Sequence, residues 1–98
     1  MEKLYNGKGQ VAVLISKGYG AGWSTWNDEL SPMDKRYAQL ILDGKIDKAI
    51  KLADKECYFL DGLKNCKIEW LDEGTKFYVE EHHGDEYIIS ENDLLLEA

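Results

Sequence analysis

The sequence predicts an α+β fold in which two helices pack on one face of a mostly antiparallel sheet, with the element order β-α-α-β-β-β. Three observations lead to this prediction. The continuous apolar run from Val11 to Ile15 is typical of a buried strand. Apolar residues then recur every three or four positions between residues 33 and 57, as they do on helices. From residue 66 onward they recur at every second position, as they do on strands.

A single domain covering residues 1–98 is expected from the length of the chain, which is near the lower limit for a core without disulfides or metals. Apolar residues are 44% and charged residues 32% of the sequence, the balance of a soluble globular protein. No apolar run approaches the roughly 20 residues that span a bilayer, and the first ten residues lack the apolar stretch of a secretory signal. We therefore expect a cytoplasmic protein without membrane contact, in which Cys57 and Cys66 are free, packed thiols.

The first strand is expected at Val11 to Ile15, between Gly9 and the glycines that begin at residue 18. This run has no polar residue on either face, so it suits a central strand that is buried on both sides. Residues 3–6 are expected to pair beside it.

Two helices are expected in the middle of the chain. Ser31 as N-cap, Pro32 as the first helical residue and Asp34 in the first turn predict where the first helix begins, and Gly44 predicts where it ends. The short join resembles a DNA-binding helix-turn-helix, but the second helix opens IDKAIKLADK and offers no Arg, Asn or Gln to read bases. Plain helical packing is therefore favoured. The apolar stripe of the second helix comprises Ile46, Ala49, Ile50, Ala53 and Cys57.

A three-stranded antiparallel meander is expected at residues 66–71, 75–80 and 86–90, joined by turns at 72–74 and 82–85. The leucines at residues 94–96 are expected in a short helix or an edge strand. Because these three leucines need cover from the core or from another subunit, a homo-oligomer is one expectation.

Negative charge is concentrated in the last third of this small acidic protein. The net charge is −7, but residues 69–98 carry −9 and residues 1–68 carry +2. An acidic surface disfavours direct binding to nucleic-acid phosphates. It can instead meet a basic protein, or serve only to keep the protein soluble. The candidate partner-binding residues are Glu80, Glu81, Asp85 and Glu86.

The segment from Lys17 to Asn27, KGYGAGWSTWN, is the candidate binding loop. It lacks the spacing of a dinucleotide-binding or P-loop motif, but its glycine amides can form a nest for an anion. Lys17 would offset phosphate charge, the Gly20 and Gly22 amides would donate, and a tryptophan would stack on a planar base. Alternatively, the tryptophans fill the space between helices and sheet while the glycines permit a tight crossover. The candidate ligand-binding residues are Lys17, Gly18, Tyr19, Gly20, Gly22, Trp23, Ser24, Thr25 and Trp26.

Catalysis and metal binding are not expected. His82 and His83 are adjacent, so on a strand their side chains point to opposite faces, and a solvated hairpin tip without metal is expected. Ser24 and Cys57 are potential nucleophiles, but nothing ties a histidine to either of them. We therefore expect a protein that is not an enzyme and has no cofactor, and a hydrolase ranks third among the hypotheses.

Two segments, VAVLISKGYGAGWSTWN and IEWLDEGTKFYVEEHHGDEYI, resemble a family of small bacteriophage and prophage proteins. That family has a G-x-G-A-G-W-S-T-W segment after an apolar strand and a W-L-x-E-G-T hairpin before an acidic strand. This chain departs from it at His82 and His83, where an aromatic-acidic pair is expected. The resemblance implies a phage accessory protein that acts in the host cytoplasm and blunts a host defence.

Two functions of different kinds follow as hypotheses. In the first, the glycine loop binds a nucleotide-like or other anionic small ligand and sequesters a host signal without turning it over. In the alternative, the acidic face covers a basic surface on a host defence protein or nucleic-acid-binding protein.

Overall fold

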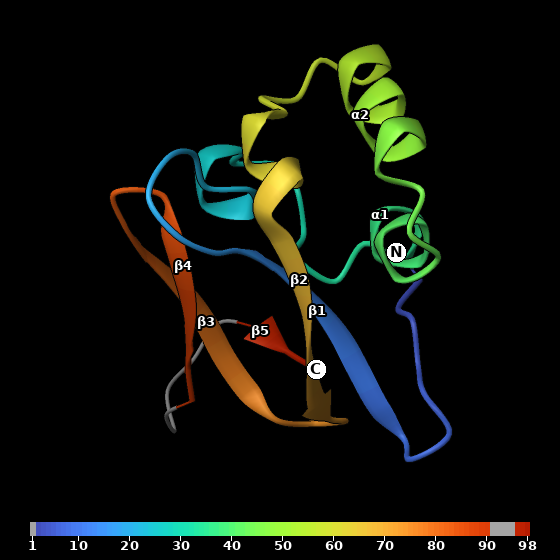
Figure 1. The fold of residues 1–98 in the computed structure, drawn as a ribbon. Coiled ribbons are helices and arrows are strands. Elements are labelled where there is room, and N and C mark those ends of the chain that lie inside the picture. Colours follow the sequence, from blue (N-terminus) through green and yellow to red (C-terminus); the bar gives the residue numbers. More distant parts are fainter. Residues whose placement is uncertain (1, 91–95) are drawn as a thin grey trace.

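Two helices and two antiparallel sheets make up the part of the chain that the computed structural model describes, residues 2–90 and 96–98 (Figure 1). The predicted α+β class is therefore confirmed, but the strands form two sheets instead of one. The strands are β1 (Gln10–Ser16), β2 (Cys66–Asp72), β3 (Lys76–His82), β4 (Asp85–Ile89) and β5 (Leu96–Glu97). The helices are α1 (Lys35–Leu42) and α2 (Ile46–Lys55), and two 3-10 turns are η1 (Ser24–Trp26) and η2 (Asp61–Asn65).

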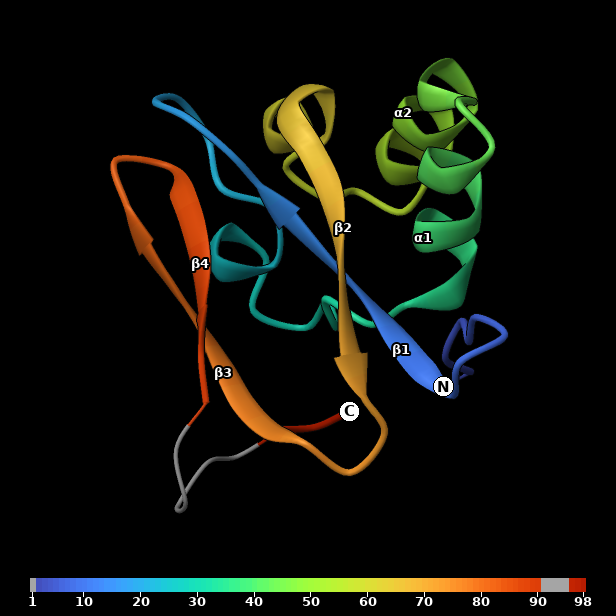
Figure 2. The same cartoon turned by 60° about the horizontal axis from the view of Figure 1, so that its bottom comes forward.

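The predicted meander is wrong in one connection, because β2 pairs with β1 and not with β3. The turn after β2 carries the chain into the second sheet (Figure 2). In that sheet β3 lies between β4 and β5. The end of the chain occupies the edge of β3 that β2 would need: Phe77 is paired with Leu96, and the Gly74 amide donates to the Ala98 carbonyl at 2.5 Å. The β3–β4 hairpin itself forms as expected. Of the leucine tail, residues 94 and 95 lie outside the described residues.

Strand β1 is buried on both faces, as predicted, because it lies between two parts of the core. Val11, Val13 and Ile15 pack in a cluster that includes side chains of β3 and β4. Ala12 and Leu14 point the other way, into clusters that include side chains of the helices. The residues of β1 therefore alternate between helices on one side and the second sheet on the other.

The predicted strand at residues 3–6 is reduced to a single bridge between Tyr5 and Val11. Beside this bridge, the Ala12 amide donates to the Leu4 carbonyl at 2.9 Å. β1 is thus paired with a full strand, β2, along one edge and with short segments of chain along the other. β1 is therefore an edge strand and not the central strand that was expected. On its second edge, the Ala12 and Leu14 amides donate to carbonyls of segments outside the sheet, at Leu4 and Pro32.

Helix α1 begins later than predicted. Its N-cap is Asp34, whose carboxylate accepts from the Arg36 amide at 3.0 Å. The predicted cap, Ser31, instead closes a turn before the helix, and the Pro32 carbonyl accepts from the Leu14 amide at 2.8 Å. The segment that contains the proline is therefore held against β1, which delays the start of the helix.

Both helices end in the same type of turn, with a residue in the left-handed region. Gly44 has φ +71° after α1, and the Lys45 amide donates to the Leu40 carbonyl at 2.8 Å. This is the predicted glycine end. After α2, Cys57 takes the same place with φ +64°, and the Tyr58 amide closes the turn. A side chain at positive φ is strained, so this second end is the less favourable one.

The two cysteines are free thiols, as expected, but they differ in burial. Cys66 is half-buried against the core beside β1, and burial raises the pKa of its thiol above the ordinary range. Cys57 is exposed, contrary to the expectation that it is packed, because it has left α2 at the helix end.

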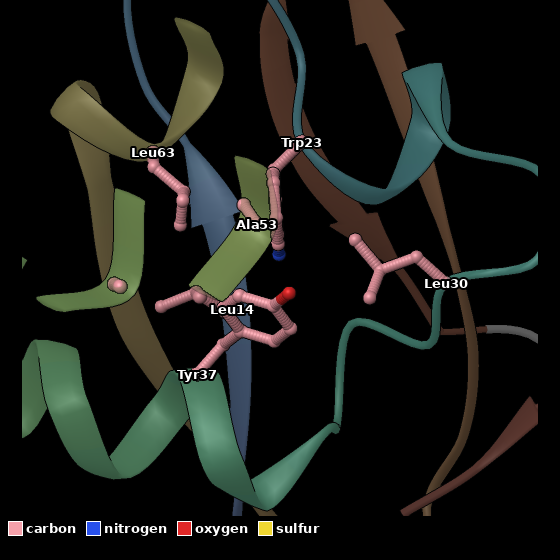
Figure 3. Packing of buried hydrophobic residues seen from close by; sticks show 7 residues of the cluster. Leu14, Trp23, Leu30, Tyr37, Ala53 and Leu63 are labelled. Carbon is pink, nitrogen blue, oxygen red and sulfur yellow. The ribbon is translucent and has the colours of Figure 1, made fainter. Parts of the chain in front are cut away.

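Trp23 is the largest side chain of the core and has no exposed surface. It packs beneath the glycine loop against side chains of β1, α1 and η2 (Figure 3). Its ring centroid lies 5.0 Å from that of Tyr37 and 6.2 Å from that of Tyr58, in edge-to-face geometry in both cases. One of the two loop tryptophans therefore fills the space between helices and sheet, as the packing alternative predicted.

Candidate functional site

The outer part of the glycine loop is fastened to the β3–β4 hairpin. The Gly20 amide donates to the His83 carbonyl at 2.9 Å, and the Gly18 amide donates to Asp85 Oδ1 at 2.8 Å. Both segments lie at the same end of the molecule (Figure 1). We call these two segments, Lys17–Gly20 and His82–Asp85, the composite tip.

Lys17 adds charge to this connection. Its Nζ lies 3.1 Å from Asp85 Oδ1 and donates to the Glu86 carbonyl at 2.8 Å. The Gly18 amide and the Lys17 ammonium lower the pKa of Asp85, so this carboxylate is ionised at neutral pH. Lys17, predicted to offset the charge of a ligand, offsets that of the hairpin.

Glu86 supplies a carboxylate to the inner part of the glycine loop. Oε1 accepts from the Ser16 amide at 2.8 Å. Oε2 accepts from the amides of Trp23 at 2.9 Å and Thr25 at 3.1 Å, and from the Thr25 hydroxyl at 2.6 Å. The side chain has no exposed surface, so Glu86 is not on the acidic outer face, where it was expected. The carboxyl group that these donors bind is therefore the protein's own.

Glycines on the segments that pack against the loop, and not those of the loop itself, allow backbone to approach backbone closely. In the loop, Gly18 and Gly20 have positive φ and open space where a Cβ would lie, and a Cβ on Gly22 would overlap the side chains of Thr25 and Trp26. A Cβ on Gly84 would overlap the Gly20 carbonyl, and a Cβ on Gly62 would overlap the Gly22 carbonyl. The hairpin and η2 therefore pack directly on the loop, but the glycines that make this possible are Gly84 and Gly62, and not the loop glycines named in the packing alternative. The amides that bind Glu86 belong to non-glycine residues, and the Gly20 amide, a predicted ligand donor, is bonded to the hairpin.

The aromatic residues of the loop lie in three different environments. Trp23 is buried, whereas Tyr19 is 82% exposed and Trp26 is 42% exposed. The Trp26 ring packs on the Phe59 ring, with 5.3 Å between centroids. Ser24 and Thr25 line a separate cavity of about 300 Å³ between η1 and β3. The predicted ligand-binding residues are therefore not gathered around one pocket.

The hairpin turn brings its two histidines together. His83 and Gly84 both have positive φ, +51° and +86°, as a two-residue hairpin turn requires. His83 has thus left the extended strand, so the imidazoles do not point to opposite faces, and their centroids are 4.3 Å apart. The His83 ring also lies 5.6 Å from the ring of Tyr19. A cavity of about 230 Å³ at this tip is lined by Gly18, Tyr19, His82 and Asp85.

The four candidate partner-binding acids separate into different positions. Pairing of His82 with Asp85 puts Glu80 on the same face of the hairpin as these two residues. Glu81 lies on the other face, is exposed, and accepts from the Gly84 amide at 2.8 Å. Three of the four acids are thus available at or near the surface of the composite tip, and Glu86 is not.

Asn27 is a structural residue of this region that the sequence reasoning missed. Its side-chain Oδ1 accepts from the Phe59 amide at 2.8 Å, and its Nδ2 donates to the Phe59 and Trp23 carbonyls, each at 3.0 Å. It therefore joins the end of the glycine loop to the segment after α2. The only signal in the sequence is an asparagine that follows an aromatic-rich loop.

Within residues 2–90 and 96–98, no three His, Cys, Asp or Glu side chains come together as a metal site requires. In the same part of the chain, neither helix has the length and apolar character needed to cross a membrane. No protein-family model, curated protein or solved structure matches the chain. The candidate site therefore rests on the geometry of its own residues.

Proposed function

We propose that this protein is a non-enzymatic binding protein whose contact surface is the composite tip, and that it binds a basic surface of another protein. The observation that carries the proposal is the position of Tyr19. Its ring is 82% exposed, although the residues on both sides of it are hydrogen-bonded to the hairpin. An exposed aromatic ring on a fixed backbone loses little entropy on binding, and such rings dominate many protein interfaces.

Charge supports a basic partner. Glu80 and Asp85 share one face of the hairpin, and the last third of the chain carries −9. Complementary charge accelerates association and selects the partner. Under this proposal, association becomes faster as the salt concentration falls.

The first hypothesis, sequestration of a small anionic ligand by the loop, has less support. The Gly20 amide, one of the two predicted donors, is bonded to the His83 carbonyl. The Trp23 and Thr25 amides are bonded to Glu86, and Trp23 has no surface on which a base could stack. The resemblance to phage proteins fits the proposal as a setting. In that setting, the composite tip would occlude a basic surface of a host defence protein or nucleic-acid-binding protein.

The test is capture of a partner from bacterial lysate with the wild-type protein and two tyrosine variants. Tyr19→Ala is expected to weaken binding of the captured protein at least about tenfold, as loss of a hot-spot residue does. Tyr5→Ala is the matched control, because Tyr5 is also exposed and also lies beside an acid, Glu73, but is not part of the composite tip. Equal binding by both variants would exclude the composite tip as the contact surface.

A second measurement separates the two hypotheses. In calorimetry against a panel of cyclic and ADP-ribose-derived nucleotides, the proposal predicts no heat of binding. A saturating heat with any of them, in the absence of a stoichiometric protein partner, would overturn the proposal in favour of ligand sequestration.

A further inference from the structure

The cavity at the composite tip has the size of a site for one side chain. Its volume is about 230 Å³, below the roughly 300–1,000 Å³ of typical small-molecule sites. Loop residues Gly18 and Tyr19 line it on one side, and hairpin residues His82 and Asp85 line it on the other. Because the loop and the hairpin are hydrogen-bonded to each other, the cavity is present before any partner binds.

A negative charge lies in the lining of this cavity. The Asp85 carboxylate has its pKa lowered by the Gly18 amide and by Lys17, and its side chain is 40% exposed. Both of those contacts fall on Oδ1. Lys17 is not among the lining residues, but its Nζ, which also donates to the Glu86 carbonyl, offsets part of this charge from 3.1 Å. Oδ2, which neither contact occupies, is the acceptor that the cavity offers to a further cationic donor.

The aromatic lining distinguishes between cations. The Tyr19 ring is held near the His83 ring, with 5.6 Å between centroids and a tilt of 43°. A guanidinium is planar, stacks on aromatic rings, and carries several N–H donors in one fixed plane, so one of them can donate to Asp85 Oδ2 while the plane lies on a ring. An ammonium is a compact, strongly hydrated point charge and therefore gains less from contact with an aromatic ring. A ring and a carboxylate in one small cavity thus suit arginine better than lysine.

We propose that this cavity receives an arginine side chain of the partner, which stacks on Tyr19 and pairs with Asp85. This inference rests on the proposed function, because it takes the composite tip to be the contact surface. It adds the chemical class of the residue that is recognised: an exposed arginine on a basic protein segment.

The experiment is an NMR titration of the ¹⁵N-labelled protein with the capped peptide Ac-Gly-Arg-Gly-amide, and with the same peptide carrying lysine or citrulline. The arginine peptide is expected to shift the amides of Gly18, Tyr19, His82 and Asp85 with a saturating curve. The lysine peptide is expected to bind about two- to fivefold more weakly, because it loses the stacking contribution. The citrulline peptide, which has the shape without the charge, is expected to shift none of them.

Variants test the two walls of the cavity separately. Tyr19→Leu keeps an apolar side chain and is expected to reduce the preference for arginine over lysine to nearly one. Asp85→Asn is expected to abolish the shifts, and an unchanged spectrum for residues outside the tip shows that this variant is folded. Tyr5→Ala is expected to bind as the wild type does. Equal shifts with arginine and citrulline, or shifts centred on other acids, would overturn the inference.

Failure of this inference is distinguishable from failure of the proposed function. If Tyr19→Ala abolishes capture of a protein but the arginine peptide leaves the tip amides unshifted, the contact surface stands and the arginine site is excluded. If the peptide shifts the tip but capture is insensitive to Tyr19, the arginine site stands and the contact surface is excluded.

Discussion

The outer and inner parts of the glycine loop are close in sequence but have opposite surroundings. The outer part, Lys17–Gly20, is bonded to the hairpin and leaves Tyr19 in solvent. The inner part includes Trp23 and Thr25, whose amides donate to the carboxylate of Glu86. Neither Trp23 nor Glu86 has any exposed surface. Amides arranged to hold an anion are thus a sign of anion binding, but they do not reveal whether the anion is a ligand or a side chain of the same chain.

The largest effect that would test this contrast is expected at the tryptophans. Trp23→Ala should lower the free energy of unfolding by about 3–5 kcal/mol, because it leaves a large cavity in the core. Trp26→Ala should cost about 1 kcal/mol or less, because that ring is partly exposed and packs mainly on Phe59. Urea denaturation followed by circular dichroism measures both. Equal losses would mean that the buried and the partly exposed tryptophan of the loop do not differ in the way described.

A smaller difference is expected between two glutamates that face each other across the hairpin. Glu86→Gln should destabilise the protein by about 2–4 kcal/mol, because an amide group replaces a buried acceptor oxygen among four donors. Glu81→Gln should change stability by less than about 0.5 kcal/mol, since glutamine can still accept from the Gly84 amide at the surface. Thermal melts of the two variants, which have the same change of charge, provide the comparison. A stable Glu86→Gln protein would contradict the role of Glu86 as the internal anion.

The smallest difference in stability is expected between a glycine that allows close packing, Gly62, and a glycine that allows positive φ, Gly18. Gly62→Ala should cost about 1–3 kcal/mol, because the added methyl group overlaps the Gly22 carbonyl and the backbone must move. Gly18→Ala has open space and loses only the ease of positive φ, a cost of about 1 kcal/mol. Chemical denaturation gives the order of the two losses. A reversed order would indicate that backbone conformation, and not close approach, is the main requirement in this region.

Local patterns predicted most of the elements of the fold but not their partners. The period of apolar residues located both helices and the strands, and Gly44 correctly marked the end of the first helix. Alternation, however, shows which residues share a face and not which strand lies alongside. The pairing of β2 with β1 therefore could not be read from it. The start of α1 was misplaced for a similar reason: Pro32 has a tertiary hydrogen bond that outweighs its preference for the first helical turn.

The spacing of glycines and tryptophans drew attention to the loop, but its contacts could not be read from the sequence. The amides that bind Glu86 belong to Ser16, Trp23 and Thr25, and not to the predicted donors Gly20 and Gly22. Nothing local to Glu86 distinguishes it from Glu80 and Glu81, because its burial follows from the register of the hairpin and the position of the loop beneath it. Asn27 was missed because its partner, Phe59, is 32 positions away.

The internal carboxylate also sets an order of events during synthesis. Seventy positions separate Ser16 from Glu86. At about 5–20 residues per second, a ribosome adds those residues in about 4–14 seconds, and for that time the amides of the nascent loop have no carboxylate to bind. The loop can close only after the hairpin has left the exit tunnel, so this segment is completed by a residue that is made 70 positions later.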